Sequence, residues 1–137
     1  MGYTHYWEIK KELPKEQWEA FKDETCALLD DPSVSDIIGD ARGNAGFPRI
    51  TDTEVTFNGV GKKAHETFSI DRCAGRREHD KPTFNFCKTA YKPYDRYVVR
   101  VLLLAEKHFG DSISVSSDGN WEEIRNQNQN QTKETNE

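Results

Sequence analysis

The sequence predicts a single α+β domain, with two main helices packed on one face of a mainly antiparallel or mixed sheet of short strands. Two stretches, at about 14–30 and 93–109, have apolar residues at helical spacing. Shorter stretches around them alternate polar and apolar residues, as strands do. The connections among the middle strands are short, which favours antiparallel pairing. A length of 137 residues fits one domain.

The first third of the chain predicts a strand, a helix and a loop. Residues 3–9 predict a strand because they alternate between two faces and are rich in aromatic residues. One face carries Tyr3, His5, Trp7 and Ile9, and the other carries Thr4, Tyr6 and Glu8. Pro14 suits the first turn of a helix, and an apolar stripe follows it to about Asp30. The glycines and prolines of 32–48 predict a loop, with a short helical turn at 35–38.

The middle of the chain predicts several short strands, at 49–51, 54–57 and 66–70. Asn58-Gly59 is a tight-turn signal. Residues 71–82 are charged and irregular, which predicts an exposed loop. The extended segment that follows, at 83–86, places Phe84 and Phe86 on one side.

The last third begins with the strongest helix signal. Pro93 and Asp95 favour a helix start, apolar residues surround most of the helix, and Gly110 is placed to end it. We therefore expect this helix to be central. Residues 111–117 alternate and predict a strand, followed by a turn at 117–119 and a short helix that includes Trp121 and Ile124.

The end of the chain, at 126–137, contains no apolar side chain. Such a segment cannot bury any surface, so we expect a disordered Asn/Gln-rich tail. The folded body is then residues 1–125.

The composition argues against several classes of protein. A net charge of −5 argues against general nucleic-acid binding, since such proteins are usually basic. No stretch approaches about 18 consecutive apolar residues, so we expect no membrane span, and the N-terminus does not resemble a secretion signal. Three cysteines, an odd number, fit reduced thiols in a cytoplasm.

The charge is unevenly distributed along the chain. Residues 1–61 have a net charge of −6 and residues 101–137 a net charge of −4. Residues 62–100 carry ten basic and five acidic side chains, a net charge of +5. This basic middle is either a solvated loop or a local site for an anion such as a phosphate.

The start of the predicted second helix is a candidate anion site. Lys88, Thr89 and Lys92 precede it, and a helix N-terminus offers free N–H groups. The Asp95 carboxylate would compete with an external anion for those N–H groups. The phosphate-binding motifs GxxxxGK[ST] and GxGxxG are both missing from the sequence.

Other polar residues permit sharper and plainer interpretations. His5 and His65 are either an acid–base or metal-binding pair or two structural histidines. A zinc site would need Cys73, His79 and Cys87, but their spacing is unusual and a fourth ligand is missing nearby. The serines and Asp118 at the end of the last predicted strand are either ligand groups or an ordinary turn, residues 114–118.

Five motifs resemble a group of small proteins of bacteriophages and prophages. They are MGYTHYW at 1–7, FNG at 57–59, HETF at 65–68, FCKTAxKPYD at 86–95 and FGDxIxVSSDG at 109–119. The resemblance implies a phage accessory protein that acts in the cytoplasm of the bacterial host. It carries over no catalytic mechanism.

The leading hypothesis is a protein that binds a phosphorylated small molecule, most simply a nucleotide. Tyr6 or Tyr94 would stack on the base, Lys88 and Lys92 would meet phosphate, and His65 or Asp118 would fix the orientation. In a phage, such binding would serve to sequester a host immune signal. The candidate ligand-binding residues are His5, Tyr6, Asn58, His65, Thr67, Lys88, Thr89, Lys92, Tyr94, Ser116 and Asp118.

Two alternatives remain open. In the first alternative, the chain inhibits a host protein by binding it directly through the acidic first third. In the second alternative, the chain is a small hydrolase of phosphate esters or nucleotides. His5 and His65 would then be the acid and the base, and Glu66 or Asp118 would orient them. We expect no cofactor and no metal. An oligomer is compatible with the sequence.

Overall fold

The computed structural model describes residues 3–73 and 83–135, with side chains described as far as Asn128. The longer strands are β1 (Thr4–Ile9), β4 (Glu54–Gly59), β5 (Phe68–Asp71), β6 (Thr83–Lys88) and β7 (Ile113–Ser117). Two short strands are β2 (Ile38–Gly39) and β3 (Arg49–Ile50). The α-helices are α1 (Lys15–Leu29), α2 (Asp95–Phe109) and α3 (Trp121–Thr135). Two single 3₁₀ turns are η1 (Gly61–Lys63) and η2 (Gly110–Ser112).

The strands form two antiparallel sheets. In the first sheet, β1 lies between β6 and β7 and pairs antiparallel with both. In the second sheet, β4 pairs antiparallel with β2, β3 and β5. The α+β prediction is confirmed, although the strands belong to two sheets rather than one.

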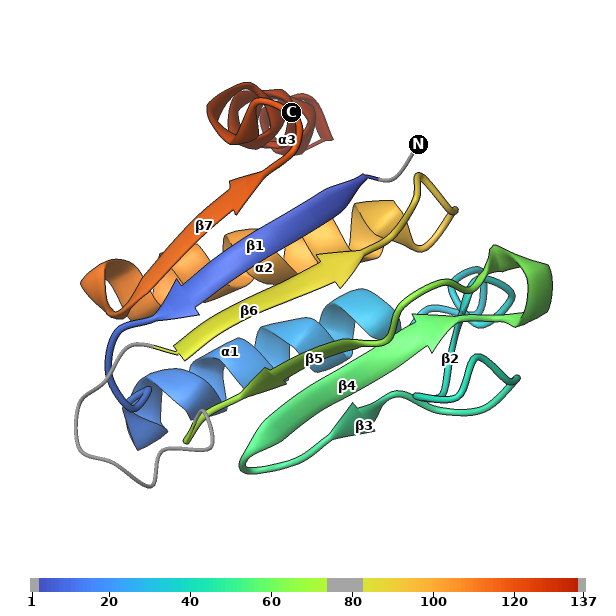
Figure 1. Ribbon diagram of the computed structural model, residues 1–137, viewed down its shortest axis with the longest axis horizontal. Coiled ribbons are helices and arrows are strands. Elements are labelled where there is room, and N and C mark those ends of the chain that lie inside the picture. The colour runs from blue at the N-terminus through green and yellow to red at the C-terminus, as the bar shows by residue number, and fades with distance from the viewer. Residues whose placement is uncertain (1–2, 74–82, 136–137) are drawn as a thin grey trace.

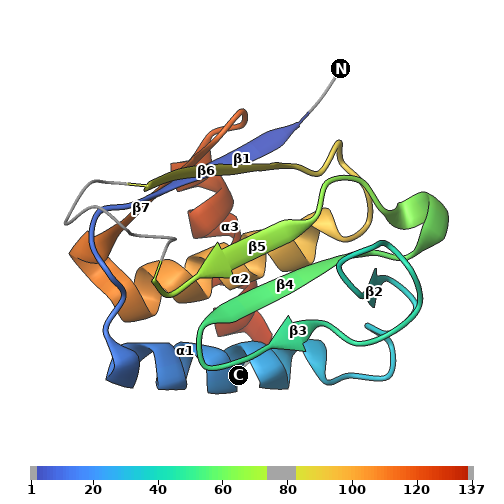
Figure 2. The same ribbon diagram turned by 60° about the horizontal axis from the view of Figure 1, so that its bottom comes forward.

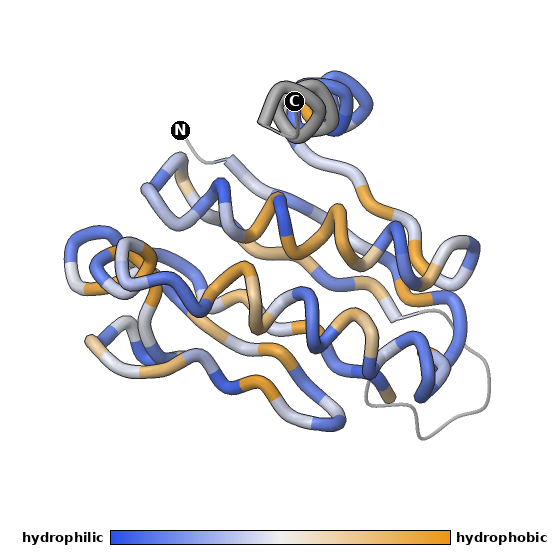
Figure 3. The backbone as a smooth tube through the Cα atoms, turned by 180° about the vertical axis from the view of Figure 1, so that it is seen from behind, coloured by the Kyte–Doolittle hydropathy of each residue, from blue (hydrophilic) through white to orange (hydrophobic). Residues whose placement is uncertain are grey.

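The strands form one layer, and α1 and α2 cover one side of it (Figures 1 and 2). Seen from behind, the two helices lie in front of the strands, and apolar turns recur along both (Figure 3). The helix α2 connects β6 to β7, which flank β1 and therefore run parallel to each other. This is a split β-α-β unit, completed by the N-terminal strand.

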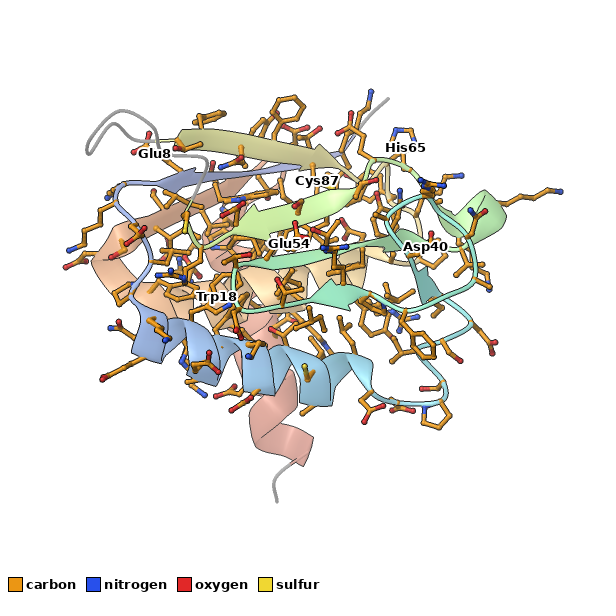
Figure 4. The ribbon with its side chains drawn as sticks, turned by 90° about the horizontal axis from the view of Figure 1, so that it is seen from below. Glu8, Trp18, Asp40, Glu54, His65 and Cys87 are labelled. Carbon is orange, nitrogen blue, oxygen red and sulfur yellow. The ribbon has the colours of Figure 1, made fainter. Side chains whose placement is uncertain are left out.

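A single apolar core lies between the two layers. Trp7 of the first sheet contacts Phe68 of the second, with ring centroids 5.1 Å apart, so both sheets share this core. Trp18 lies between α1 and the strands (Figure 4), and its Nε1–H donates to the Thr51 carbonyl. The central position predicted for the second long helix is confirmed by seven buried side chains, Tyr97, Val98, Val99, Val101, Leu102, Ala105 and Phe109.

Two sequence predictions differ from the structure. Asn58 and Gly59 are the last residues of β4, not a turn. Over residues 126–135, where the sequence predicts a disordered tail, α3 continues to Thr135. The N-terminus of this helix is capped, because the Asn120 side-chain oxygen accepts a hydrogen bond from the Glu123 N–H. Residues 136 and 137 lie outside the described part of the chain.

The loop predicted at 71–82 lies outside the described residues from 74 onward. Within the described part of the chain, no helix has the length and apolar character needed to cross a membrane.

Candidate functional site

The strand β1 separates the predicted site residues onto two faces. His5, Trp7 and Ile9 point into the core and are buried, as the alternation predicts. Thr4, Tyr6 and Glu8 therefore lie on the opposite face, away from α1 and α2. His5 and Tyr6 consequently cannot both contact one small ligand.

The outer face of β1 continues onto its two neighbours, because residues directly opposite each other share a face. On β6, Lys88 lies opposite Thr4, Phe86 opposite Tyr6 and Phe84 opposite Glu8. On β7, Ser116 lies opposite Tyr6 and Ser114 opposite Glu8. We call this set the outer aromatic face: Thr4, Tyr6, Glu8, Phe84, Phe86, Lys88, Ser114 and Ser116, with Asp118 at its rim.

Two large apolar rings on this face are open to solvent. Phe84 is 64% exposed and Phe86 is 60% exposed. The half-buried ring of Tyr6 lies beside Phe84, with centroids 6.1 Å apart and planes at 37°. Two exposed rings of β6 and the half-buried Tyr6 ring of β1 therefore lie together, whereas the exposed Phe47 and Tyr91 lie outside this sheet face.

The outer face of the second sheet has no such rings among its paired residues. Glu54 and Thr56 of β4 lie opposite Asp71 and Ser69 of β5. Thr56 and Ser69 share a hydrogen bond of 2.8 Å between their hydroxyls. A sheet face open to water is usually polar, as it is here. The aromatic character of the first sheet is thus a local property.

Polar groups line the β7 edge and the Lys88 end of the outer aromatic face. The Tyr6 hydroxyl donates to Asp118 Oδ1 at 2.7 Å, and the Thr4 backbone N–H donates to Asp118 Oδ2 at 3.1 Å. The hydrogen bond to Asp118 raises the pKa of Tyr6. The ammonium of Lys88 has no ion-pair partner among the described residues, so its charge is available to an anion.

The start of α2 is occupied by contacts within the protein. Thr89 is fully buried and its hydroxyl donates to Asp95 Oδ1 at 2.5 Å. The same oxygen accepts a hydrogen bond from His5 Nε2 at 2.7 Å. The Asp95 backbone N–H donates to the Lys92 carbonyl. The Asp95 carboxylate is therefore held by His5 and Thr89 and does not cap the helix, whose start has no side-chain cap.

Tyr94 is also buried, so its ring offers no face to a base. Its hydroxyl donates to the Glu66 carbonyl at 2.6 Å. Burial raises the pKa of Tyr94 and, to about 12, that of the neighbouring Cys87. Lys92 is half-buried, and no hydrogen bond or ion pair of its side chain occurs within the described residues.

A separate cluster organises the turn after β4. The Asn58 amide donates to the His65 carbonyl and to Thr67 Oγ1, and its oxygen accepts the N–H of Gly59 and of His65. Thr67 in turn donates to the Ala41 carbonyl at 2.6 Å. These bonds shape the loop, which accounts for Asn58 and Thr67 without a ligand.

The two histidines have different environments. His5 is fully buried and bonded to Asp95, whereas His65 is exposed. His65 and Glu8 lie towards opposite ends of the strand layer (Figure 4). No interaction joins His5 to His65 in the part of the chain that the structure describes.

The structure thus brings together four of the expected ligand residues, namely Tyr6, Lys88, Ser116 and Asp118. It holds Asn58, His65 and Thr67 in a second cluster, and His5, Thr89 and Tyr94 inside the protein. Sequence reasoning missed Phe84 and Phe86 as site residues. The signal available in the sequence was their spacing of two residues, which places both rings on the same face of a strand.

No group of three metal-ligating side chains that could hold a metal ion occurs within residues 3–73 and 83–128. Of the proposed zinc ligands, Cys87 is buried, Cys73 is partly buried and His79 lies outside the described residues. No protein-family model, curated protein or solved structure matches the chain.

Proposed function

We propose that this protein binds a nucleotide on the outer aromatic face. The observation that carries the proposal is the exposure of Phe84 and Phe86 next to Tyr6 on adjacent strands. Aromatic rings on an open sheet are a recurrent platform for bases, and each stacked base contributes about 1–3 kcal/mol.

The polar groups around the rings suit the rest of a nucleotide. Lys88 follows Phe86 by two residues on the same face and supplies a positive charge for a phosphate. Glu8 and Asp118 supply carboxylates, which accept hydrogen bonds from the amino groups of bases. The serine hydroxyls of β7 both donate and accept.

The size of the face favours a small ligand over a protein. A stable protein complex buries about 800 Å² on each partner, mostly around an apolar centre. Two exposed phenylalanines and a half-buried tyrosine, bordered by charges and hydroxyls, form a much narrower strip.

The proposal is binding without turnover. His5 is fully buried and bonded to Asp95, so it has no access to a ligand on the opposite face of β1. In the phage setting that the sequence resemblance implies, we propose that binding sequesters a host nucleotide signal.

Calorimetry and native mass spectrometry against a panel of nucleotides test the proposal. We expect Phe86→Ala to weaken binding about 5- to 150-fold, the equivalent of one lost stacking contact. Phe47→Ala is the matched control, since Phe47 is 91% exposed but lies in the loop before β3.

Four outcomes contradict the proposal. The first is a panel in which nothing binds, and the second is equal affinity of wild type and Phe86→Ala. The third is a stoichiometric host protein retained from lysate with no small ligand, which supports direct inhibition of a host protein instead. Ligand released as a changed product supports the hydrolase.

A further inference from the structure

We infer that the ligand of the outer aromatic face is a dinucleotide whose two bases are unstacked from each other. This inference rests on the proposed function and specifies its ligand. It is carried by the spacing of the exposed rings and by the charges around them.

The spacing of the rings requires separated bases. Phe84 and Phe86 are two residues apart on β6, which places their Cα atoms about 6.8 Å apart at the usual rise of a strand. Stacked bases in one strand of a duplex are only about 3.4 Å apart. Two bases that each cover one phenylalanine must therefore separate from each other.

The two ring positions are distinct platforms. The Tyr6 ring leans on Phe84, its diagonal neighbour, and the two form one composite surface. Phe86 makes no ring contact with any other residue that the structure describes, although it lies opposite Tyr6 in the register. The first base would cover Phe86 and the second would cover the surface of Tyr6 and Phe84.

The polar neighbours of the two platforms differ as well. Lys88 is the next residue of β6 on the face beyond Phe86, so the positive charge lies at that end. Phe84 lies opposite Glu8, which in turn lies opposite Ser114. The phosphodiester joins the two nucleosides and is therefore expected between the platforms, on the side nearer Phe86 and Lys88, with an amino-bearing base edge towards Glu8.

The charges limit the length of the ligand. A chain with a net charge of −5 repels a polyanion, and Glu8 and Asp118 add negative charge at the face itself. Among the described residues, Lys88 is the one lysine of this face, and its single charge balances one phosphodiester. The face thus fits a dinucleotide better than an extended single-stranded nucleic acid, whose affinity depends on many neutralised phosphates.

The experiment compares ligands of three lengths on the full chain. Dissociation constants are measured by calorimetry for the ribonucleoside monophosphates, for all linear ribodinucleotides built from them, and for single-stranded decamers. We expect the best dinucleotide to bind at least tenfold more tightly than either of its mononucleotides. We expect a decamer that contains it to bind no more tightly.

Variants assign the two platforms. Phe84→Ala and Phe86→Ala are each expected to reduce the dinucleotide affinity to that of a mononucleotide, whereas Phe47→Ala leaves it unchanged. With the dinucleotide, the ring resonances of both Phe84 and Phe86 should shift in NMR spectra. With a mononucleotide, one ring should shift more strongly than the other.

The outcomes separate this inference from the function on which it rests. Equal affinity for mononucleotide and dinucleotide, with loss in only one phenylalanine variant, overturns the two-base ligand and keeps nucleotide binding. A decamer that binds much more tightly overturns the length limit in favour of single-stranded nucleic acid. Binding of none of the three ligands overturns the proposed function itself.

Discussion

His5 Nε2 lies 2.7 Å from Asp95 Oδ1, and this contact ties the first strand to the first residue of α2. The two residues are 90 positions apart in the sequence. Thr89 donates to the same carboxylate oxygen. The contact therefore fastens together β1, the end of β6 and α2, inside the protein and away from the outer aromatic face.

Asp95→Ala should destabilise the fold. The variant leaves the fully buried His5 ring without a hydrogen-bond partner, which lowers the free energy of unfolding by about 1–3 kcal/mol. Urea denaturation followed by circular dichroism measures the change. Glu16→Ala is the matched control, because Glu16 is also an acidic residue in a first helical turn but is exposed. Equal losses in the two variants would mean that only the helix dipole matters.

Asp118→Asn should lower the pKa of Tyr6. In the wild type the hydrogen bond to the Asp118 carboxylate raises that pKa above the ordinary value of 10.0. The bond therefore exists at lower pH and is lost as the pH rises through the raised pKa. NMR titration of the tyrosine ring carbons measures the shift. Tyr94 is the internal control, since burial is the main cause of its raised pKa. An unchanged Tyr6 titration would contradict the assigned cause.

The cysteines should differ in their reactivity with a thiol reagent. Cys87 is buried, and its pKa is raised to about 12 by burial. At neutral pH its thiolate fraction is about a thousandfold below that of a thiol with the ordinary value of 9.0. Cys26 is exposed. We expect Cys26 to be labelled in the native protein and Cys87 only after unfolding. The variant Cys26→Ser is the control that removes the Cys26 reaction, and labelling is read residue by residue because Cys73 is only partly buried. Rapid native labelling of Cys87 would refute its burial.

The helix α3 should be anchored by its first turn. Trp121 is 6% exposed, and its Nε1–H donates to Glu106, which also accepts from Arg125. Trp121→Ala should lower the free energy of unfolding by about 3 kcal/mol. A chain that ends at Asn128 should unfold like the full chain, within about 0.5 kcal/mol, because its missing segment has no apolar residue. Thermal melting curves of Trp121→Ala and of the chain that ends at Asn128 compare the contributions of the two ends of the helix.

The helices were the most predictable part of the fold. The apolar stripes at 14–30 and 93–109 agree closely with α1 and α2, since a long period of 3.6 residues is a local signal. The alternation of residues 3–9 correctly placed His5 and Tyr6 on opposite faces of the first strand. The helix of 126–135 was missed because it has no apolar stripe, although Asn120 and Glu123 form a recognisable helix start.

The site was less predictable because strand partners are not a local property. The sequence shows that Phe84 and Phe86 share a side, but not which side faces the helices. That choice depends on Cys87 packing in the core, and on the pairing of β6 with a strand that lies near the other end of the chain. Thr89 and Tyr94 resembled ligand residues for the same reason, since their partners Asp95 and Glu66 only become visible in three dimensions.

The position of β1 between β6 and β7 also determines when the outer face appears during synthesis. The ribosome makes β1 first, but the two strands that flank it are made late, and Tyr6 and Asp118 are 112 positions apart. The first strand therefore has no partner in this sheet until β6 has left the ribosome, and it lacks its second partner until β7 has followed. A nascent chain that stalls before β7 exposes one edge of its N-terminal strand, and it has no complete ligand face to bind with.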